Sequence, residues 1–293
     1  MMLWLMAARP RTLPAAVAPV LVGTAAAIEA TRDFRAGAFI AALIGSVFIQ
    51  IGTNLANDYS DAKRGADTVD RLGPVRVTAA GLVTPRRVLV ATWIAFGVAV
   101  AAGAYLAAVA GPVILAVGAA SILAGVLYTG GPRPYGYAGL GELFVFLFFG
   151  LVAVNGSYYV QVERLDWLAF ALSIPVGLLA TAILVVNNLR DIDTDRRVGK
   201  RTLAARLGRE RTRTLYVALV AGAYVALLVG LLAAGGPGWG ALAVLSAALA
   251  RRPVAAVRTR TDGPSLNAAL AATGMLLAAF SVLLAAGLLL ATA

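Results

Sequence analysis

The sequence predicts an all-α integral membrane protein with nine transmembrane helices. Its 293 residues are 60% hydrophobic and only 13% charged, with a mean hydropathy of +0.85, whereas a soluble domain is about half apolar and a quarter charged. The apolar residues gather in long runs such as 266–292, and a run of about 18 or more is typical of a bilayer-spanning helix. These observations exclude a soluble globular protein and make the lipid bilayer a partner of the chain.

Nine apolar runs lie between clusters of charged residues, and the length and apolarity of each predict one span. The first eight are 13–30, 37–56, 88–108, 111–128, 139–157, 167–187, 214–234 and 238–250, and the ninth is 266–292. The eighth is short for a bilayer. Its helix could extend past Arg251 and Arg252, because long basic side chains reach back to the membrane surface.

The Lys and Arg residues predict the orientation of the spans. With the N-terminus in the cytoplasm, 22 of the 25 basic residues fall on the cytoplasmic side, and the exceptions are Arg32, Arg35 and Arg164. Because basic loops are retained in the cytoplasm, we expect an N-inside, C-outside protein of the cell (inner or cytoplasmic) membrane. The same rule accounts for the net charge of +11, so no nucleic-acid partner is expected.

The chain contains no cysteine and no histidine. This composition excludes disulfides, thiolate nucleophiles, zinc sites built on Cys or His, and Ser-His-Asp catalysis. A catalytic metal would therefore need oxygen ligands, which favours magnesium, calcium or manganese.

Half of the acidic residues cluster in two predicted cytoplasmic segments. The retention of basic loops in the cytoplasm explains arginine in such segments but does not explain clustered aspartate. The clustered residues are Asp58, Asp61, Asp67 and Asp70 after the second span, and Asp191, Asp193 and Asp195 after the sixth. One interpretation is solvated loop acids that balance nearby arginines. The other is a pair of functional sites, and the match between the two segments favours it.

The two acidic segments align with each other. In the alignment, Asn54, Asn57 and Asp61 match Asn188, Asp191 and Asp195. The segments lie four spans apart and follow spans of the same direction. They therefore predict a single domain, 1–293, made of two parallel four-helix pseudo-repeats (roughly 13–128 and 139–250) with the last helix, 266–292, appended.

These matched residues predict a magnesium site. Residues at i and i+4 share one face of a helix, so Asn57 lies beside Asp61, and Asp191 beside Asp195. Packed carboxylates are costly to desolvate without a compensating charge. Magnesium compensates them and prefers a few carboxylates plus phosphate oxygens, so we expect a diphosphate bridged by Mg²⁺ between the two halves.

Cations and aromatic residues accompany the acidic segments. The only two lysines, Lys63 and Lys200, lie one in each segment, and lysine is a compact charge suited to phosphate. The loop after the fourth span is rich in Gly and Pro and carries one Arg and three Tyr, namely Arg133, Tyr128, Tyr135 and Tyr137. Glu142 and Asn155 are polar groups at or in the membrane and are functional candidates by default, although Asn155 fits an interhelical hydrogen bond equally well.

In these motifs the chain resembles the UbiA superfamily of intramembrane aromatic prenyltransferases. The signature is Asn57-Asp58-x-x-Asp61 after the second span and Asp191-x-x-x-Asp195 after the sixth. The three cytoplasmic loops around 65–78, 128–137 and 187–203 resemble the MenA branch, whose members prenylate 1,4-dihydroxy-2-naphthoate. One departure is Gly65, where many members of the superfamily carry a further Asp; the branch resemblance favours Asp67 over Asp70 as the acid that assists the metal.

The resemblance implies a mechanism and a role for each candidate residue. A polyprenyl diphosphate would place its tail between apolar helices and its head on two Mg²⁺ ions. The implied metal ligands are Asn57, Asp61, Asp191 and Asp195, with Asp58 and Asp67 assisting. Groups implied to face the diphosphate or the aromatic acceptor are Asn54, Lys63, Arg76, Tyr128, Arg133, Tyr135, Tyr137, Asn155, Asn188 and Lys200.

Three alternatives remain at the level of the sequence. Another aromatic acid, such as 4-hydroxybenzoate, could be the acceptor. A transporter with parallel repeats would place its charges nearer the bilayer midplane. A CDP-alcohol phosphotransferase would carry its aspartates in a single segment.

Overall fold

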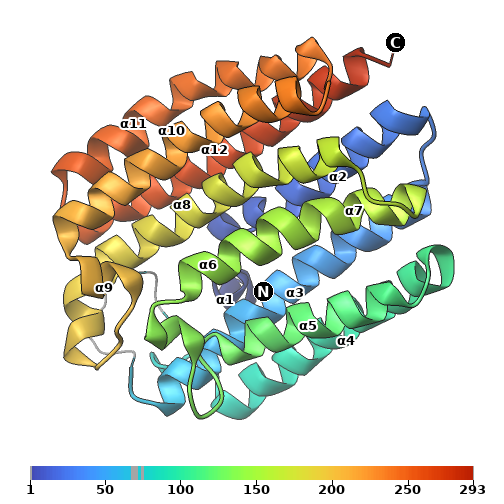
Figure 1. Cartoon of the computed structure of the whole chain (residues 1–293). Coiled ribbons are helices and arrows are strands. Elements are labelled where there is room, and N and C mark those ends of the chain that lie inside the picture. The colour runs from blue at the N-terminus through green and yellow to red at the C-terminus, as the bar shows by residue number, and fades with distance from the viewer. Residues whose placement is uncertain (1, 67–71, 74–75, 293) are drawn as a thin grey trace.

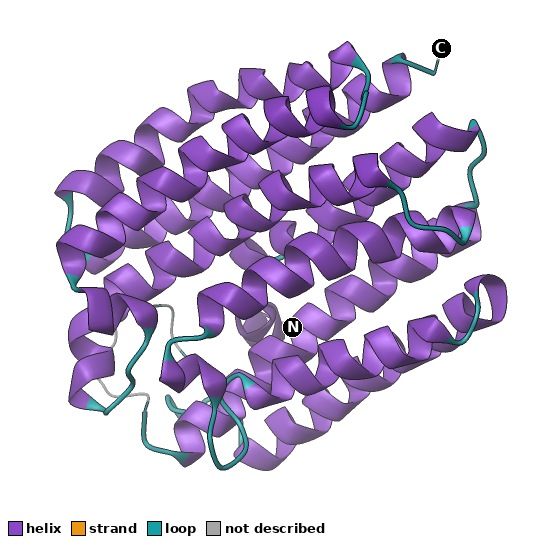
Figure 2. Ribbon diagram, viewed as in Figure 1, coloured by secondary structure: helices purple, strands orange, loops and turns teal. Residues whose placement is uncertain are grey.

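The computed structural model describes residues 2–66, 72–73 and 76–292, and within these ranges the chain is entirely helices and loops (Figures 1 and 2). Eight segments of the described part of the chain are long and apolar enough to cross a membrane, which confirms an all-α, multi-pass membrane protein. They are α2 (Pro14–Thr31), α3 (Ala36–Lys63), α4 (Pro85–Ala110), the stretch Gly141–Val162, α8 (Trp167–Arg197), α10 (Arg209–Ala233), the stretch Gly238–Thr259 and α12 (Gly263–Leu290).

Two of these stretches change helix type along their length. Gly141–Val162 consists of α6 (Gly141–Val145), the π-helical segment η3 (Phe146–Val152) and α7 (Ala153–Val162), and Gly238–Thr259 consists of the 3-10 segment η4 (Gly238–Ser246) and α11 (Ala247–Thr259). Among the residues that the structure describes, four short segments lie outside the predicted spans: α1 (Met2–Ala8), η1 (Pro10–Thr12), η2 (Tyr135–Ala138) and α9 (Leu203–Leu207).

The fourth predicted span is the helix α5 (Val113–Leu127), which has only 15 residues. At 1.5 Å per residue this is about 22 Å, less than the roughly 30 Å of a bilayer core. The helix starts directly after Gly111 and Pro112, where Gly111 has a φ of 96°, and it ends before the Gly- and Pro-rich loop. Eight of the nine predicted spans therefore have a helix of spanning length, and the count of nine stays a prediction.

Helices α3 and α8 both continue through their acidic motifs and end in the same way. Gly65 and Gly199 have φ values of 66° and 75°, a conformation that glycine adopts without steric cost. In both helices the residue after the glycine donates to an aspartate carbonyl five positions earlier: Ala66 N to Asp61 O at 2.9 Å, and Lys200 N to Asp195 O at 2.9 Å. These are paired Schellman caps. They give Gly65 a structural role at the position where many superfamily members carry Asp.

The most buried span, α8, lies between two groups of helices (Figure 1). Helices α10 and α12 pack along one side of it, and α2 and α7 pack along another, with α3, α4 and α5 beyond them. Small residues allow close approaches, because a Cβ on Gly23 would lie 2.2 Å from the carbonyl oxygen of Val154, as is typical of membrane helix interfaces. Large apolar side chains on the outer surface, such as Trp93 and Leu232, are 63% and 84% exposed, as expected for a surface that faces lipid.

Candidate active site

A cavity of about 340 Å³ lies among the helices and collects the matched motifs at one end. Apart from Arg9, its charged lining comes from the last turns of α3 and α8 and the loops that follow them: Asp61, Arg76, Asp191, Asp195 and Lys200, with Asn57 one turn before Asp61. Earlier turns of α3, the far end of α4, α5 and η3 supply an apolar lining that includes Ile49, Leu106, Val117 and Val152. The cavity therefore joins a charged head region to an apolar tail region.

Asp61 is the centre of the charged region. Its side chain is 1% exposed, and its Oδ2 accepts hydrogen bonds from Arg76 Nη2 at 3.2 Å and Lys200 Nζ at 3.1 Å. Its Oδ1 accepts from the Tyr137 hydroxyl at 2.8 Å, and Lys200 Nζ lies 4.7 Å from the centroid of the same ring. Two cations and a phenol therefore converge on one carboxylate, and charge-assisted bonds of this kind are the stronger ones.

Asp191 is held by its own neighbour in the sequence. Arg190 donates from Nε to Asp191 Oδ1 at 2.8 Å and from Nη2 to Oδ2 at 2.6 Å. Arg190 is 1% exposed, so this two-pronged pair is shielded from water. A carboxylate has about four lone-pair positions, and the arginine occupies only one on each oxygen.

The second motif has two further polar residues at the cavity. Asp195 lies one turn beyond Asp191, and its backbone carbonyl accepts from Lys200 N, which directs the chain after α8 back toward the cavity. Asn188 donates from Nδ2 to Glu142 Oε1 at 2.9 Å, and Glu142 is buried. The hydrogen bond fixes the orientation of the Asn188 amide, whose side chain lines the cavity.

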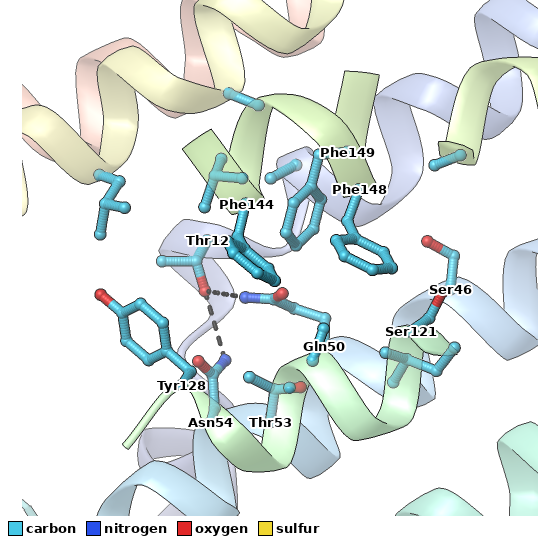
Figure 3. A pocket seen from close by; sticks show the side chains of 18 of the residues that line it. Thr12, Ser46, Gln50, Thr53, Asn54, Ser121, Tyr128, Phe144, Phe148 and Phe149 are labelled. Atoms are coloured by element: carbon cyan, nitrogen blue, oxygen red, sulfur yellow. Dashed lines mark hydrogen bonds between the residues drawn. The ribbon is translucent and has the colours of Figure 1, made fainter. Parts of the chain in front are cut away.

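The amides of the first motif are held by partners outside it. Asn57 Oδ1 accepts from the Thr129 hydroxyl at 2.8 Å. Figure 3 shows Gln50 and Asn54, which donate from their amides to Thr12 Oγ1 at 3.3 Å and 3.4 Å. The N-terminal segment thus supplies one wall of the cavity.

Aromatic rings form the wall opposite α3, where Phe144, Phe148 and Phe149 face the α3 side chains across the cavity (Figure 3). Tyr135 stacks on Phe144 with centroids 3.9 Å apart and lies 5.4 Å from the Tyr128 ring. Burial raises the pKa of the Tyr128 phenol well above its ordinary value and also raises the pKa of Tyr135. Both phenols therefore stay neutral at physiological pH.

Several predicted residues lie away from the cavity. Arg133 and Lys63 are exposed and absent from the lining. Asn155 donates to the Leu151 carbonyl of its own helix at 2.8 Å, which favours a structural role over the predicted contact with substrate. Asp58 is buried but does not line the cavity, and Asp67 lies outside the described residues.

The sequence-based hypotheses missed Arg190, Thr129, Thr12 and Gln50. Arg190 carried a signal, because it is a charged residue inside the second motif at the position where the first motif has Ala56. The other three are neutral side chains in or beside predicted spans. Their contribution depends on contacts between distant segments that no local pattern reveals.

The donor set fits magnesium. Asn57, Asp61, Asp191 and Asp195 all offer oxygen atoms to one cavity, and oxygen is the ligand that this ion prefers. Within the described ranges, no three acidic side chains form a ready metal cluster. An ion at this site would therefore share its coordination with water and with oxygens of the substrate, as Mg²⁺ commonly does.

The chain matches known proteins along most of its length. The UbiA prenyltransferase family pattern matches residues 16–277. A 1,4-dihydroxy-2-naphthoate octaprenyltransferase of Mycobacterium tuberculosis is 46% identical over 287 residues, which cover 97% of this chain and 96% of the relative. The Escherichia coli protein of the same name is 41% identical over 252 residues, covering 84% and 82% of the two chains.

Solved structures share the fold. A UbiA homolog from Archaeoglobus fulgidus, bound to GPP and Mg²⁺, has a TM-score of 0.63 with 13% identity, covering 96% of this chain and 99% of that one. A UbiA homolog from Aeropyrum pernix has a TM-score of 0.67 with 18% identity, covering 95% and 98%. The motifs, the cavity and these similarities agree: the chain belongs to the UbiA prenyltransferase family.

Proposed function

We propose that this protein transfers a polyprenyl group from polyprenyl diphosphate to 1,4-dihydroxy-2-naphthoate. The reaction requires Mg²⁺, releases diphosphate and CO₂, and gives demethylmenaquinol for menaquinone biosynthesis. The choice of substrates rests on the identity with two enzymes named for this acceptor. It is 46% over 97% of the chain for one and 41% over 84% of the chain for the other. The form of the cavity supports the type of reaction.

The charged end of the cavity suits the diphosphate head. Lys200 and Arg76 already contact a carboxylate there, and they are proposed to turn toward the more highly charged diphosphate. Asn57, Asp61, Asp191 and Asp195 are the proposed metal ligands. Mg²⁺, when bound, neutralises charge on the diphosphate oxygens as the carbon–oxygen bond breaks.

The apolar end suits the polyprenyl tail. Its lining residues come from earlier turns of α3, the far end of α4, α5 and η3. An isoprenoid chain loses no hydrogen bond when it leaves the lipid for this apolar lining. The allylic cation that forms on departure of diphosphate needs a dry site with an electron-rich face. Neutral Tyr128, which lines the cavity beside Tyr135, provides such a face next to the charged end.

The acceptor needs little help from an acid or a base. The dihydroxynaphthoate ring is electron-rich, and its ring carbon attacks the allylic cation. Loss of CO₂ from the attacked carbon then restores aromaticity, so no histidine is required. The aromatic wall of Phe144, Phe148 and Phe149 (Figure 3) offers rings against which two fused rings could pack.

The charged end of the cavity is proposed to face the cytoplasm. The basic residues favour a cytoplasmic N-terminus, which places the ends of α3 and α8, and hence the charged end of the cavity, at the cytoplasmic surface. The two acidic segments are proposed to be equivalent parts of two pseudo-repeats, and the matching helix caps at Gly65 and Gly199 support this equivalence.

The experiment is an acceptor panel. Membranes that contain the protein are incubated with Mg²⁺, a polyprenyl diphosphate and a set of aromatic acids, and the lipid products are identified by mass. We expect product from 1,4-dihydroxy-2-naphthoate. Product from 4-hydroxybenzoate alone would refute the acceptor assignment while leaving prenyl transfer intact.

A further inference from the structure

Arg190 connects α8 to a helix outside both acidic motifs. Besides its two bonds to Asp191, it donates from Nη2 to Asn187 Oδ1 at 2.9 Å and from Nη1 to Asn267 Oδ1 at 2.6 Å. Asn267 lies near the start of α12, the helix that follows both pseudo-repeats. The last helix therefore reaches the carboxylate of Asp191 through a single arginine.

The same asparagine also contacts Leu72, which lies between α3 and α4 in the sequence. Its Nδ2 donates to the Leu72 carbonyl oxygen at 2.9 Å. Close packing accompanies this bond, because a Cβ on Gly263 would lie 3.0 Å from the same oxygen. The connection that contains Leu72 also carries Arg76, which pairs with Asp61. The Asn267 amide thus contacts both Leu72 and the arginine that holds Asp191.

We infer that Asn267 is a positioning residue for the metal- and diphosphate-binding end of the cavity, acting through Arg190 on Asp191. The inference rests on the proposed function. The Asn267 amide accepts a hydrogen bond from Arg190 and donates one to Leu72 at the same time. A leucine of similar size can make neither bond. Without Asn267, a buried donor of Arg190 loses its partner, and Asn187 alone is left to orient the arginine behind Asp191.

The expected effect is on metal binding rather than on the aromatic acceptor. Loss of a hydrogen-bond partner behind a metal ligand typically costs about 10- to 100-fold in metal affinity or activity. Because Asn267 reaches Asp191 only through Arg190, we expect the lower end of this range: Asn267→Leu should raise the Mg²⁺ concentration for half-maximal activity by about 10-fold, while the KM for the acceptor stays the same.

The matched control is Thr273→Val on the same helix. Thr273 and Tyr216 share a buried hydrogen bond of 2.8 Å that ties α12 to α10, away from the cavity lining. The control also removes one interhelical bond of α12, so it measures the general effect of loosening this helix. Asn267→Ser, whose hydroxyl is too short to reach both partners, is a second variant should Asn267→Leu lower the yield of folded protein.

The second readout is independent of turnover. The purified protein is titrated with Mg²⁺ in the presence of inorganic diphosphate, and the rise in thermal unfolding temperature is followed. The inference predicts that both Asn267 variants need a higher Mg²⁺ concentration to reach half of the full increase in unfolding temperature, whereas Thr273→Val needs the same concentration as the wild type. It is overturned if the Asn267 variants keep the wild-type midpoint or if Thr273→Val shifts it equally. A wild type that Mg²⁺ and diphosphate do not stabilise would overturn the proposed metal site itself, together with this inference.

Discussion

Replacing Asp61 by asparagine removes the carboxylate on which the charged end of the cavity is organised. Asparagine has nearly the same shape, so the change leaves no void, and its Oδ1 can still accept from the Tyr137 hydroxyl. The variant loses the negative charge that faces Arg76 at 3.2 Å and Lys200 at 3.1 Å. Two cations then face each other without the anion between them.

The geometry sets the size of the effect. Asp61 is 1% exposed, and removing one partner of a buried ion pair costs about 3–5 kcal/mol. Since water in the cavity can screen the two cations, we expect the lower end, a loss of about 3 kcal/mol in the free energy of unfolding. Turnover should fall by about 10³-fold or more, because a metal site contributes several kcal/mol to the stabilisation of transition-state charge.

The assay compares Asp61→Asn with Asp193→Asn. Asp193 belongs to the second acidic segment, but its side chain is 70% exposed and pairs with Arg209 at the surface, and such pairs are worth at most about 1 kcal/mol. Prenyl transfer and thermal unfolding are measured for both variants in the same detergent. Near-normal turnover in Asp61→Asn, or equal losses in the two variants, would refute the placement of Asp61 at the reacting end.

Three further predictions follow from the site and the topology. Lys200→Ala should lower kcat by about 10²–10³-fold with little change in the KM for the acceptor, because a cation facing the leaving group acts mainly in the transition state; a change confined to that KM would contradict the assignment. Burial raises the pKa of Tyr128 above its ordinary value of 10.0, so its neutral phenol contributes stability that is complete below pH 10 and is lost as the pH rises further. The unfolding temperature should thus fall less steeply above pH 10 in Tyr128→Phe than in the wild type. Equal slopes in the two proteins would contradict this contribution of Tyr128. Because the chain has no native cysteine, Arg211→Cys should be labelled from the cytoplasmic side and Leu165→Cys from the outside, and the reverse pattern would overturn the orientation.

The sequence was most informative where chemistry repeats at a fixed spacing. Asp61 and Lys200 are 139 positions apart, yet their separate motifs predicted one site, and their side chains meet at 3.1 Å. The spacing of four residues within each motif also predicted correctly that the motif residues are helical, because α3 and α8 continue through the motifs to Lys63 and Arg197. Periodicity and residue type can be read from the local sequence, and the helical motifs and their shared site depend mainly on these two properties.

The remaining features depend on three-dimensional neighbours. The sequence favoured Arg133 because it lies in an aromatic loop, but the fold of that loop turns Tyr135 toward the cavity and leaves Arg133 exposed. Similarly, the pairing of Arg190 with Asn267 joins residues 77 positions apart on helices whose contact is set by packing. Apolarity predicted the fourth span, but it does not fix where a helix begins, and α5 is shorter than the apolar run that contains it.

The measurement that tests the central claim most directly follows the carboxyl carbon of the acceptor. The protein is supplied with Mg²⁺, a polyprenyl diphosphate and 1,4-dihydroxy-2-naphthoate labelled in its carboxyl group, and labelled CO₂ and lipid product are measured together over time. Prenyl transfer at the carboxyl-bearing carbon predicts one labelled CO₂ for each lipid product and no label in the lipid. A prenylated product that keeps the label, or CO₂ released without lipid product, would contradict the account.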